Sequence, residues 1–339
     1  MEKVYTENLV AEYSKLILFS EGKKNLTAIA KKSNLSVGFV CKQFQATAQS
    51  IESVRKDLKH LSTLPFSSIR YLIIDDTVIS KEYAKKIERT GKWKDLGRRS
   101  VNGLTYLTSI ITDGHTAMPY DSMLYTAKAL KVPDYKTKSD MAHDIVTSAE
   151  QDHKIERLLA DAHYSTKALI PKLIDGGTAF LMKFTSTKNV EIGKKTKQIR
   201  EFLKLRKNEH SKTVHCIFAG VLCSFHVIRI AKDVIHYFIS NDHLDRETLL
   251  KLYKIRWKIE PMHRTVKQML GIRDCVMRKK EKQQLHVLSV MQAYAVASLV
   301  MKFHGFKTIE DAIRYVREVK PTSISSLFKP LGESDAYDA

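Results

Sequence analysis

Four residues in the last third of the chain have the types and the spacing of a site that handles phosphates. They are Tyr253, Arg256, Glu260 and Lys267. At about 100° per residue, these positions fall within about 60° of one another around a helix. One carboxylate among three phosphate-binding side chains predicts a nucleic-acid active site. The same spacing also fits a solvated basic helix face that carries one acidic residue.

A magnesium site for phosphoryl transfer needs carboxylates from several parts of the chain. Two apolar runs end in suitable acids: residues 71–75 lead into Asp75 and Asp76, and residues 158–161 lead into Asp161. Open α/β sheets usually place their sites at strand ends, so both runs predict strands that deliver carboxylates. Taken singly, each acid could instead cap the turn or helix that follows it.

Together these motifs resemble those of the DDE transposases of bacterial insertion sequences, in the group with the Tyr-(2)-Arg-(3)-Glu-(6)-Lys (YREK) signature. All four signature residues occur here at that spacing. The first family motif, Asp-x-Thr, matches Asp75-Asp76-Thr77, and the second, a strand-end Asp before a helix, matches Asp161. The resemblance extends from about residue 69 to residue 292. It implies an α/β, RNase H-like (retroviral-integrase-like) catalytic core.

The resemblance also implies the catalytic residues and their cofactor. Asp75, Asp161 and Glu260 would hold two Mg²⁺ or Mn²⁺ ions, one activating water or a 3′-hydroxyl and the other stabilising the leaving oxygen. The Asp-x-Thr register favours Asp75, and Asp76 is the alternative, because neighbouring strand residues point to opposite faces. Pro261 directly follows Glu260 and is expected to bend the helix there.

The remaining signature residues would bind DNA. Arg256 would hold a backbone phosphate of the transposon end through its fork, and Lys267 would do so as a point charge. Neither has an acidic partner at a favourable spacing except Glu260. Tyr253 would donate to the same phosphate, and Arg264 would add a further phosphate contact.

The composition agrees with a DNA partner. With 57 Lys and Arg against 37 Asp and Glu, the formal charge is +20, which suits a polyanion and predicts salt-dependent affinity. An acidic membrane surface is the competing partner, but no run of about 18 apolar residues and no secretory signal stand out. We therefore expect an intracellular protein, cytoplasmic and associated with the bacterial nucleoid. Four scattered cysteines without a Cys-x-x-Cys pair argue against a zinc site or a disulfide framework.

The length predicts several domains. Residues 1–64 are expected to form a separate helical domain, in which residues 26–44 have the pattern of a DNA-binding helix-turn-helix or of a packed helical pair. Residues 65–184 would form the first part of the core, and residues 185–247 a basic, β-rich insertion. Residues 248–305 would supply the catalytic and closing helices, and residues 306–339 a helix and a loose tail.

Within the core, the pattern predicts three antiparallel strands followed by helix, strand, helix and strand. The strands are expected at 71–75, 104–111, 117–125, 158–161 and 179–184, with a basic loop at 90–103 and helices near 141–149 and 166–174. The insertion is expected to hold strands at 213–221, 222–230 and 234–240.

Three functions fit these features. The first is a cut-and-paste transposase that cleaves transposon ends and joins them to target DNA, working as a homodimer because two ends must be paired. The second is another Mg²⁺-dependent nuclease on the same core. The third is a catalytically silent DNA-binding descendant, which a missing acid would suggest, and all three acids are present.

Overall fold

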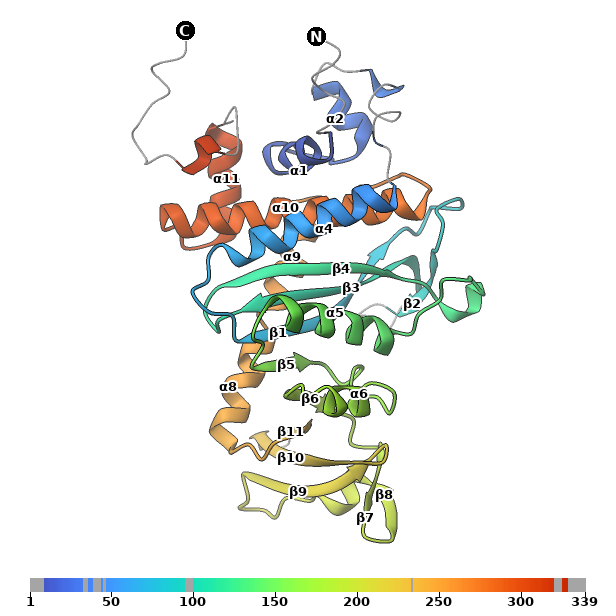
Figure 1. Ribbon diagram of the computed structural model, residues 1–339, viewed down its shortest axis with the longest axis vertical. Helices are drawn as coiled ribbons and strands as arrows, with labels where there is room; N and C mark the ends of the chain where they lie inside the picture. Colours follow the sequence, from blue (N-terminus) through green and yellow to red (C-terminus); the bar gives the residue numbers. More distant parts are fainter. Residues whose placement is uncertain are drawn as a thin grey trace.

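The computed structural model describes residues 9–32, 36–38, 44, 47–94, 100–232, 234–319 and 325–328. Within these residues, one mixed sheet runs through the molecule and helices cover its faces (Figure 1). The helices near both ends of the chain gather at one end of the long axis, and the basic insertion lies at the other.

Five strands form the centre of the sheet, in the order β4, β3, β1, β5, β6. Their bounds are β1 Tyr71–Ser80, β3 Ser100–Thr112, β4 Ala117–Tyr125, β5 Arg157–Ala160 and β6 Phe180–Phe184. β1, β3 and β4 pair antiparallel, whereas β1, β5 and β6 pair parallel. Three antiparallel strands followed by helix, strand, helix and strand were predicted; the structure has this order and pairs the last two strands parallel, an arrangement consistent with an RNase H-like core.

Local chemistry explains why these segments form strands. Leu72, Ile73 and Ile74 are fully buried, as expected of a central strand with both faces covered. The reversal between β3 and β4 is set by Asp113, whose carboxylate accepts from the main-chain N–H groups of His115 (2.8 Å) and Thr116 (2.7 Å). Such side-chain bonds to the backbone stabilise tight turns.

The first acidic pair does not lie at a strand end, contrary to the prediction. β1 continues through both acids to Ser80 because its antiparallel pairing with β3 extends from Tyr71 to Ser80. Its parallel pairing with β5 stops earlier, at Ile74 opposite Ala160. The acids therefore follow the end of the parallel pairing rather than the end of the strand.

Other boundaries also differ from the pattern. The predicted basic loop at 90–103 contains a short strand, β2 (Gly91–Lys94), which pairs with the start of β3. Helix α5 (Lys138–Asp152) is longer than expected because Thr137 and Asp140 form a capping box at its start. Helix α6 (Ile170–Asp175) begins later than residue 166, since the chain first makes turns.

The insertion contains the predicted strands, but it is continuous with the core sheet. β11 (Val234–Ser240) pairs antiparallel with β6, and β10 (Val221–Ala231) and β9 (Ser211–Phe218) follow. A hairpin of β7 (Asn189–Ile192) and β8 (Lys195–Gln198) lies at the edge beyond β9, with the short helix α7 (Ile199–Phe202) after it. Backbone hydrogen bonds thus join the insertion to β6, the strand that pairs with β5, after which Asp161 follows.

The described amino-terminal helices share the core of the protein and do not form the separate domain that was predicted for residues 1–64. Helix α4 (Ala48–Thr63) lies on β4 beside the long helix α10 (Lys280–His304), and α1 (Leu9–Phe19) packs on α10 (Figure 1). One hydrophobic core includes buried residues of α1, α4 and the sheet. The first helix of the predicted helix-turn-helix is α2 (Leu26–Lys32). Most of the second lies outside the described residues.

Helix α10 is long and apolar enough to cross a membrane by length and composition, and it passes that test alone among the helices of the described residues. In this fold it is a core helix, because most of its side chains are buried. It contacts α1, α4, β4 and α11 (Ile309–Val319). Of the predicted loose tail, the structure describes only a short 3-10 turn at Ser325–Phe328.

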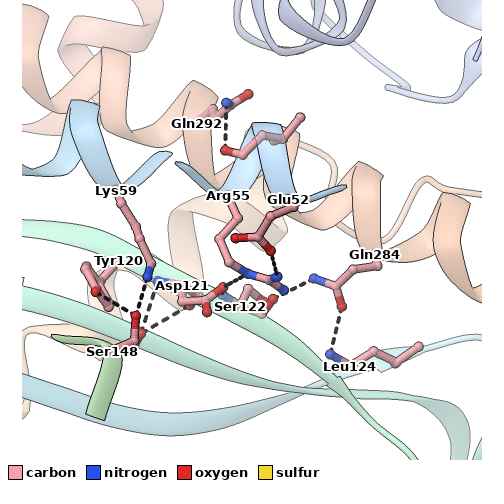
Figure 2. Close-up of polar contacts among 12 residues, drawn as sticks. Glu52, Arg55, Lys59, Tyr120, Asp121, Ser122, Leu124, Ser148, Gln284 and Gln292 are labelled. Carbon is pink, nitrogen blue, oxygen red and sulfur yellow. Dashed lines mark hydrogen bonds and ion pairs between the residues drawn. The ribbon is translucent and has the colours of Figure 1, made fainter. Parts of the chain in front are cut away.

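Polar contacts fix α4 and α10 on the sheet (Figure 2). Arg55 of α4 donates to Asp121 of β4 at 2.9 Å, and that carboxylate is buried. Gln284 of α10 accepts from the Leu124 N–H (2.8 Å) and donates to the Ser122 carbonyl (2.5 Å). β4 lies at the sheet edge beside β3. These bonds give partners to polar groups of β4, α4 and α10 that would otherwise be buried without one.

The buried ion pair between Arg55 and Asp121 should dominate the attachment of α4. Replacing Asp121 by Ala leaves a largely buried guanidinium without its main partner, and we expect it to lower the free energy of unfolding by about 2 kcal/mol. Replacing Glu156 by Ala breaks a pair with Arg70 in which both side chains are about half exposed, so it should cost about 0.5 kcal/mol or less. Urea titrations of both variants measure this. Equal losses would contradict the assignment.

Acid should destabilise the fold through His286. Its Nε2 donates to the Gly271 carbonyl (3.1 Å), so its Nδ1 accepts from the Tyr13 hydroxyl (2.7 Å), and this arrangement requires a neutral ring. Burial lowers the pKa of His286 to about 4, below about 6.5 in the unfolded chain. Stability from this group is complete above pH 6.5 and is lost as the pH falls towards 4, by about 2 kcal/mol between pH 7.5 and pH 5. In His286→Gln, denaturant titrations should show a correspondingly smaller acid-induced loss.

Candidate active site

The end of the parallel pairing between β1 and β5 brings two predicted acids together. Ile74 lies opposite Ala160 in the register, and Asp75 and Asp161 are the next residues of the two strands. Neighbouring parallel strands lie about 4.8 Å apart. The paired strands therefore lead both acids to the same end of the parallel pairing, although they are far apart in the sequence.

Asp75 faces the helices that carry the signature residues. The Arg256 guanidinium contacts its carboxylate, with Nη1 3.4 Å from Oδ2. The other terminal nitrogen of Arg256 is 3.8 Å from Glu260 Oε1. Arg256 is buried and lies between two carboxylates from distant parts of the chain. The prediction that its acidic partner would be Glu260 alone was therefore incomplete, because Asp75 is 181 residues away in the sequence.

The signature does not lie on one continuous helix. α8 (Arg246–Arg256) ends before Trp257, and α9 (Ile259–Gln268) begins after Lys258. Pro261 has no N–H to donate to the Trp257 carbonyl, which accepts instead from Glu260 N at 3.1 Å. The tighter turn ends one helix and starts the next. The predicted effect of Pro261 thus falls one turn before the proline, and Glu260 lies in the first turn of α9.

Burial makes the charge of Asp75 costly. The pKa of Asp75 is raised to about 7, mainly by desolvation; Arg256 opposes the rise, and the charges of Asp76 and Glu260 contribute to it. One guanidinium thus does not balance the carboxylates around it. A bound cation would stabilise the ionised form of Asp75.

Asp76 faces the opposite side of the sheet. Lys138 of α5 donates to its carboxylate at 2.9 Å, and the Tyr164 hydroxyl is 3.4 Å from its other oxygen. Because successive residues of a strand alternate in direction, the two acids cannot share one role. Asp75 contacts Arg256 and is close enough to Glu260 to feel its charge, whereas Asp76 is already held in an ion pair.

The Tyr164 side chain lies near three of the acids, Asp75, Asp76 and Asp161. Burial raises its pKa well above its usual value, and the charges of Asp76, Asp75 and Asp161 add to this effect. The main-chain N–H of Tyr164 donates to the Asp161 carbonyl at 3.1 Å. Sequence reasoning assigned Tyr164 no role, although it belongs to the second motif, and no signal in the sequence pointed to Lys138.

His263 fixes α9 against the sheet. Its Nε2 is 2.7 Å from the Thr108 hydroxyl oxygen, and that hydroxyl donates to the Asp75 carbonyl at 3.1 Å. Burial lowers the pKa of His263 to about 3, so the ring is neutral. This chain of hydrogen bonds joins α9, β3 and β1 at the residue that carries the first acid.

The other signature residues lie around this cluster. The Tyr253 ring packs on Phe238 of β11 at 5.2 Å and near the Lys183 ammonium at 5.4 Å, so it faces the insertion. Arg264 is exposed and forms no side-chain hydrogen bond or ion pair within the described residues. Lys267, in the last turn of α9, is partly buried.

The residues fit divalent ions in chemistry, but they are not preassembled. Within the described residues, no group of three His, Cys, Asp or Glu side chains is arranged to hold a metal ion. The guanidinium of Arg256 lies where Asp75 and Glu260 would otherwise meet, and its Nε is buried without a partner. Three carboxylates, one with a raised pKa, form the oxygen-donor set that Mg²⁺ prefers.

Comparisons with known proteins define the class and then the family. The chain resembles a solved piggyBac transposase in a synaptic complex with hairpin DNA, with a TM-score of 0.54 and 10% identity over 96% of this chain and 73% of that one. This likeness shows a shared fold. A solved Mos1 strand transfer complex matches less well, with a TM-score of 0.20 and 11% identity over 50% of this chain and 56% of that one. No curated protein matches the chain by sequence.

Residues 41–296 match the family described as "Transposase DDE domain". That match covers most of the chain, which therefore belongs to this family. The protein is a DNA transposase, an enzyme that cleaves and joins DNA.

The two neighbouring acids of β1 should differ sharply in function. Asp75→Asn removes the carboxylate that contacts Arg256, and we expect it to reduce metal-dependent nicking by at least about a thousandfold. Asp76→Asn only weakens a contact with Lys138 and should retain nicking within about tenfold. A supercoiled plasmid assay with Mn²⁺ measures both variants. Loss of activity in Asp76→Asn alone would assign the first acid to Asp76.

Proposed function

We propose that this transposase is of the bacterial insertion-sequence type with the YREK signature. It cleaves DNA at the ends of its own element and joins those ends to target DNA. The observation that carries the proposal is the position of Arg256 between Asp75 and Glu260, with Asp161 directly after Ala160, the residue that pairs with Ile74. This arrangement collects three carboxylates and one signature cation at the same end of the parallel strands.

In this proposal Asp75, Asp161 and Glu260 hold two divalent ions, Mg²⁺ or Mn²⁺. When bound, such ions activate the attacking water or 3′-hydroxyl and stabilise the leaving oxygen at the scissile phosphate. The raised pKa of Asp75 supports the choice of ligand, because a buried carboxylate with too little neighbouring positive charge is stabilised by a cation. Asp76, paired with Lys138, is left outside the set.

The remaining residues hold DNA and shape the site. Arg256 partly neutralises two acids and keeps the start of α9 close to β1. Arg264 is exposed one helical turn after Glu260, so the forked N–H donors of its guanidinium are available to bind a phosphate. Tyr253 and Lys267 are proposed to contact the same strand. Through Tyr253, the position of the insertion also affects the site.

The wider setting follows from charge and from the reaction. The formal charge of +20 supports DNA as the partner, both transposon ends and target. Pairing two ends calls for two active sites, so we propose a homodimer in the complex with DNA. The proposed location is the bacterial cytoplasm, with the protein associated with the nucleoid.

The role of Glu260 can be separated from DNA binding. Glu260→Gln removes a proposed metal ligand but keeps the phosphate contacts, so it should abolish cleavage and joining while leaving DNA affinity within about threefold. The assay contains the purified protein, Mg²⁺ or Mn²⁺, a labelled duplex with the ends that flank its gene, and a supercoiled target plasmid.

Glu247→Gln is a matched control, since it makes the same chemical change at an exposed position in the first turn of α8. It should retain both activities. Specific binding of the ends without cleavage by the wild-type protein in either metal would instead identify a silent DNA-binding descendant. Cleavage without joining would identify a nuclease.

A further inference from the structure

A basic groove lies beyond the active site, where β1 ends. It has a volume of about 770 Å³ and is formed by two segments, residues 80–87 after β1 and residues 273–278 after α9. Both segments continue elements that carry catalytic acids, and α9 contacts β1. Asp75 precedes Ser80 by five residues, which is about 17 Å along a strand.

The two walls of this groove are fastened together at both ends. Buried Lys81 donates its ammonium hydrogens to the carbonyls of Arg273 (2.7 Å) and Cys275 (2.5 Å). At the other end, the Glu88 N–H donates to the Arg278 carbonyl (2.9 Å), and the Glu88 carboxylate accepts from the Lys280 N–H (3.0 Å). The groove is thus a built feature of the fold.

The exposed cations of the groove are unpaired, unlike buried Lys81 and the basic side chains nearby. Lys279, Lys280 and Arg89 each form an ion pair with Glu88 or Asp134. By contrast, the side chains of four groove cations form no hydrogen bond or ion pair within the described residues. These are Lys85, Lys86, Arg273 and Arg278, all exposed. Glu82 is the acid among the lining residues, so the groove has an excess of positive charge.

An exposed aromatic ring lies among these cations. Tyr83 is 94% exposed and Val276 is 65% exposed, and both line the groove. The charged phosphate backbone does not bind an exposed apolar surface, whereas the flat face of an unpaired base stacks on an aromatic ring. In a duplex the base faces are covered by their neighbours. Cations that follow the backbone together with a stacking ring are the combination that binds single strands.

We propose that this groove binds single-stranded DNA that continues from the strand held at Asp75 and Glu260. Tyr83 stacks on a base, and Lys85, Lys86, Arg273 and Arg278 bind the phosphates. At about 3.4 Å per stacked nucleotide, the groove begins about five nucleotides from the reacting phosphate. The inference rests on the proposed DNA function and adds to it a preference for an unpaired strand at a defined distance.

The test compares two probes in a Glu260→Gln background, so that DNA is bound but not cut. One is a blunt duplex and the other is the same duplex with a single-stranded tail of about eight nucleotides. The wild-type groove should bind the tailed probe more tightly than the blunt one in fluorescence anisotropy. Tyr83→Ala should weaken the tailed probe about tenfold and leave the blunt probe unchanged. Tyr83→Phe keeps the ring and should retain the preference.

The charge of the groove gives a second readout. Arg278→Ala should lower the salt dependence of tailed-probe binding by about 0.7 in the slope of log K against log salt, the value for one single-strand phosphate contact. Lys154→Ala is the matched control, because it removes an exposed cation near the opposite end of β1, where β5 begins. It should leave the difference between the probes unchanged.

Two results would overturn the inference. If Tyr83→Ala binds the tailed probe as well as the wild type, the ring does not stack on a base. If the variant loses equal affinity for both probes, the groove binds duplex DNA. Binding of neither probe by the wild-type groove would refute the DNA function itself, so the two failures are distinguishable.

Discussion

The contact of Arg256 with two carboxylates is the constraint around which the candidate active site is organised. A buried guanidinium is costly unless it is paired, and so is a buried carboxylate. Asp75 on β1 and Glu260 on α9 satisfy Arg256 only if the helix pair lies close against the strand. The bonds from His263 through Thr108 to the Asp75 carbonyl hold the same arrangement from the other side. Burial still raises the pKa of Asp75, so additional positive charge would stabilise its ionised carboxylate.

Continuity of the sheet links regions that the sequence separates. Because β11 pairs with β6, and β6 pairs with β5, backbone hydrogen bonds join the insertion to the two strands on either side of Asp161 in the sequence. Tyr253 then packs on Phe238 of β11, so the aromatic member of the signature is positioned by the insertion. On the opposite edge, α4 and α10 cover β4 with a buried ion pair and glutamine bonds. Both ends of the chain thus contribute to one core.

Basic side chains are paired with acids in one region of the fold and unpaired in another. Around β2 and the start of α10, basic side chains are paired with Glu88 and Asp134, whereas those in the groove beyond β1 are not. Pairing removes the electrostatic attraction for a polyanion, and unpaired cations retain it. β1 and α9 both lead from the acids towards the unpaired cations, which is the path that we propose for single-stranded DNA.

The sequence by itself determined the family motifs, the antiparallel strands, the two later core strands and the strands of the insertion, because burial imposes periodicity on contiguous residues. It also indicated that Pro261 would disturb the helix. Only the tertiary structure decided which of Asp75 and Asp76 faces Arg256 and which faces Lys138, since strand alternation does not say what packs on each face. It also decided that Arg256 contacts Asp75 and that helices α1 and α4 share the core with the sheet. These contacts join residues far apart in the chain, and local spacing contains no information about them.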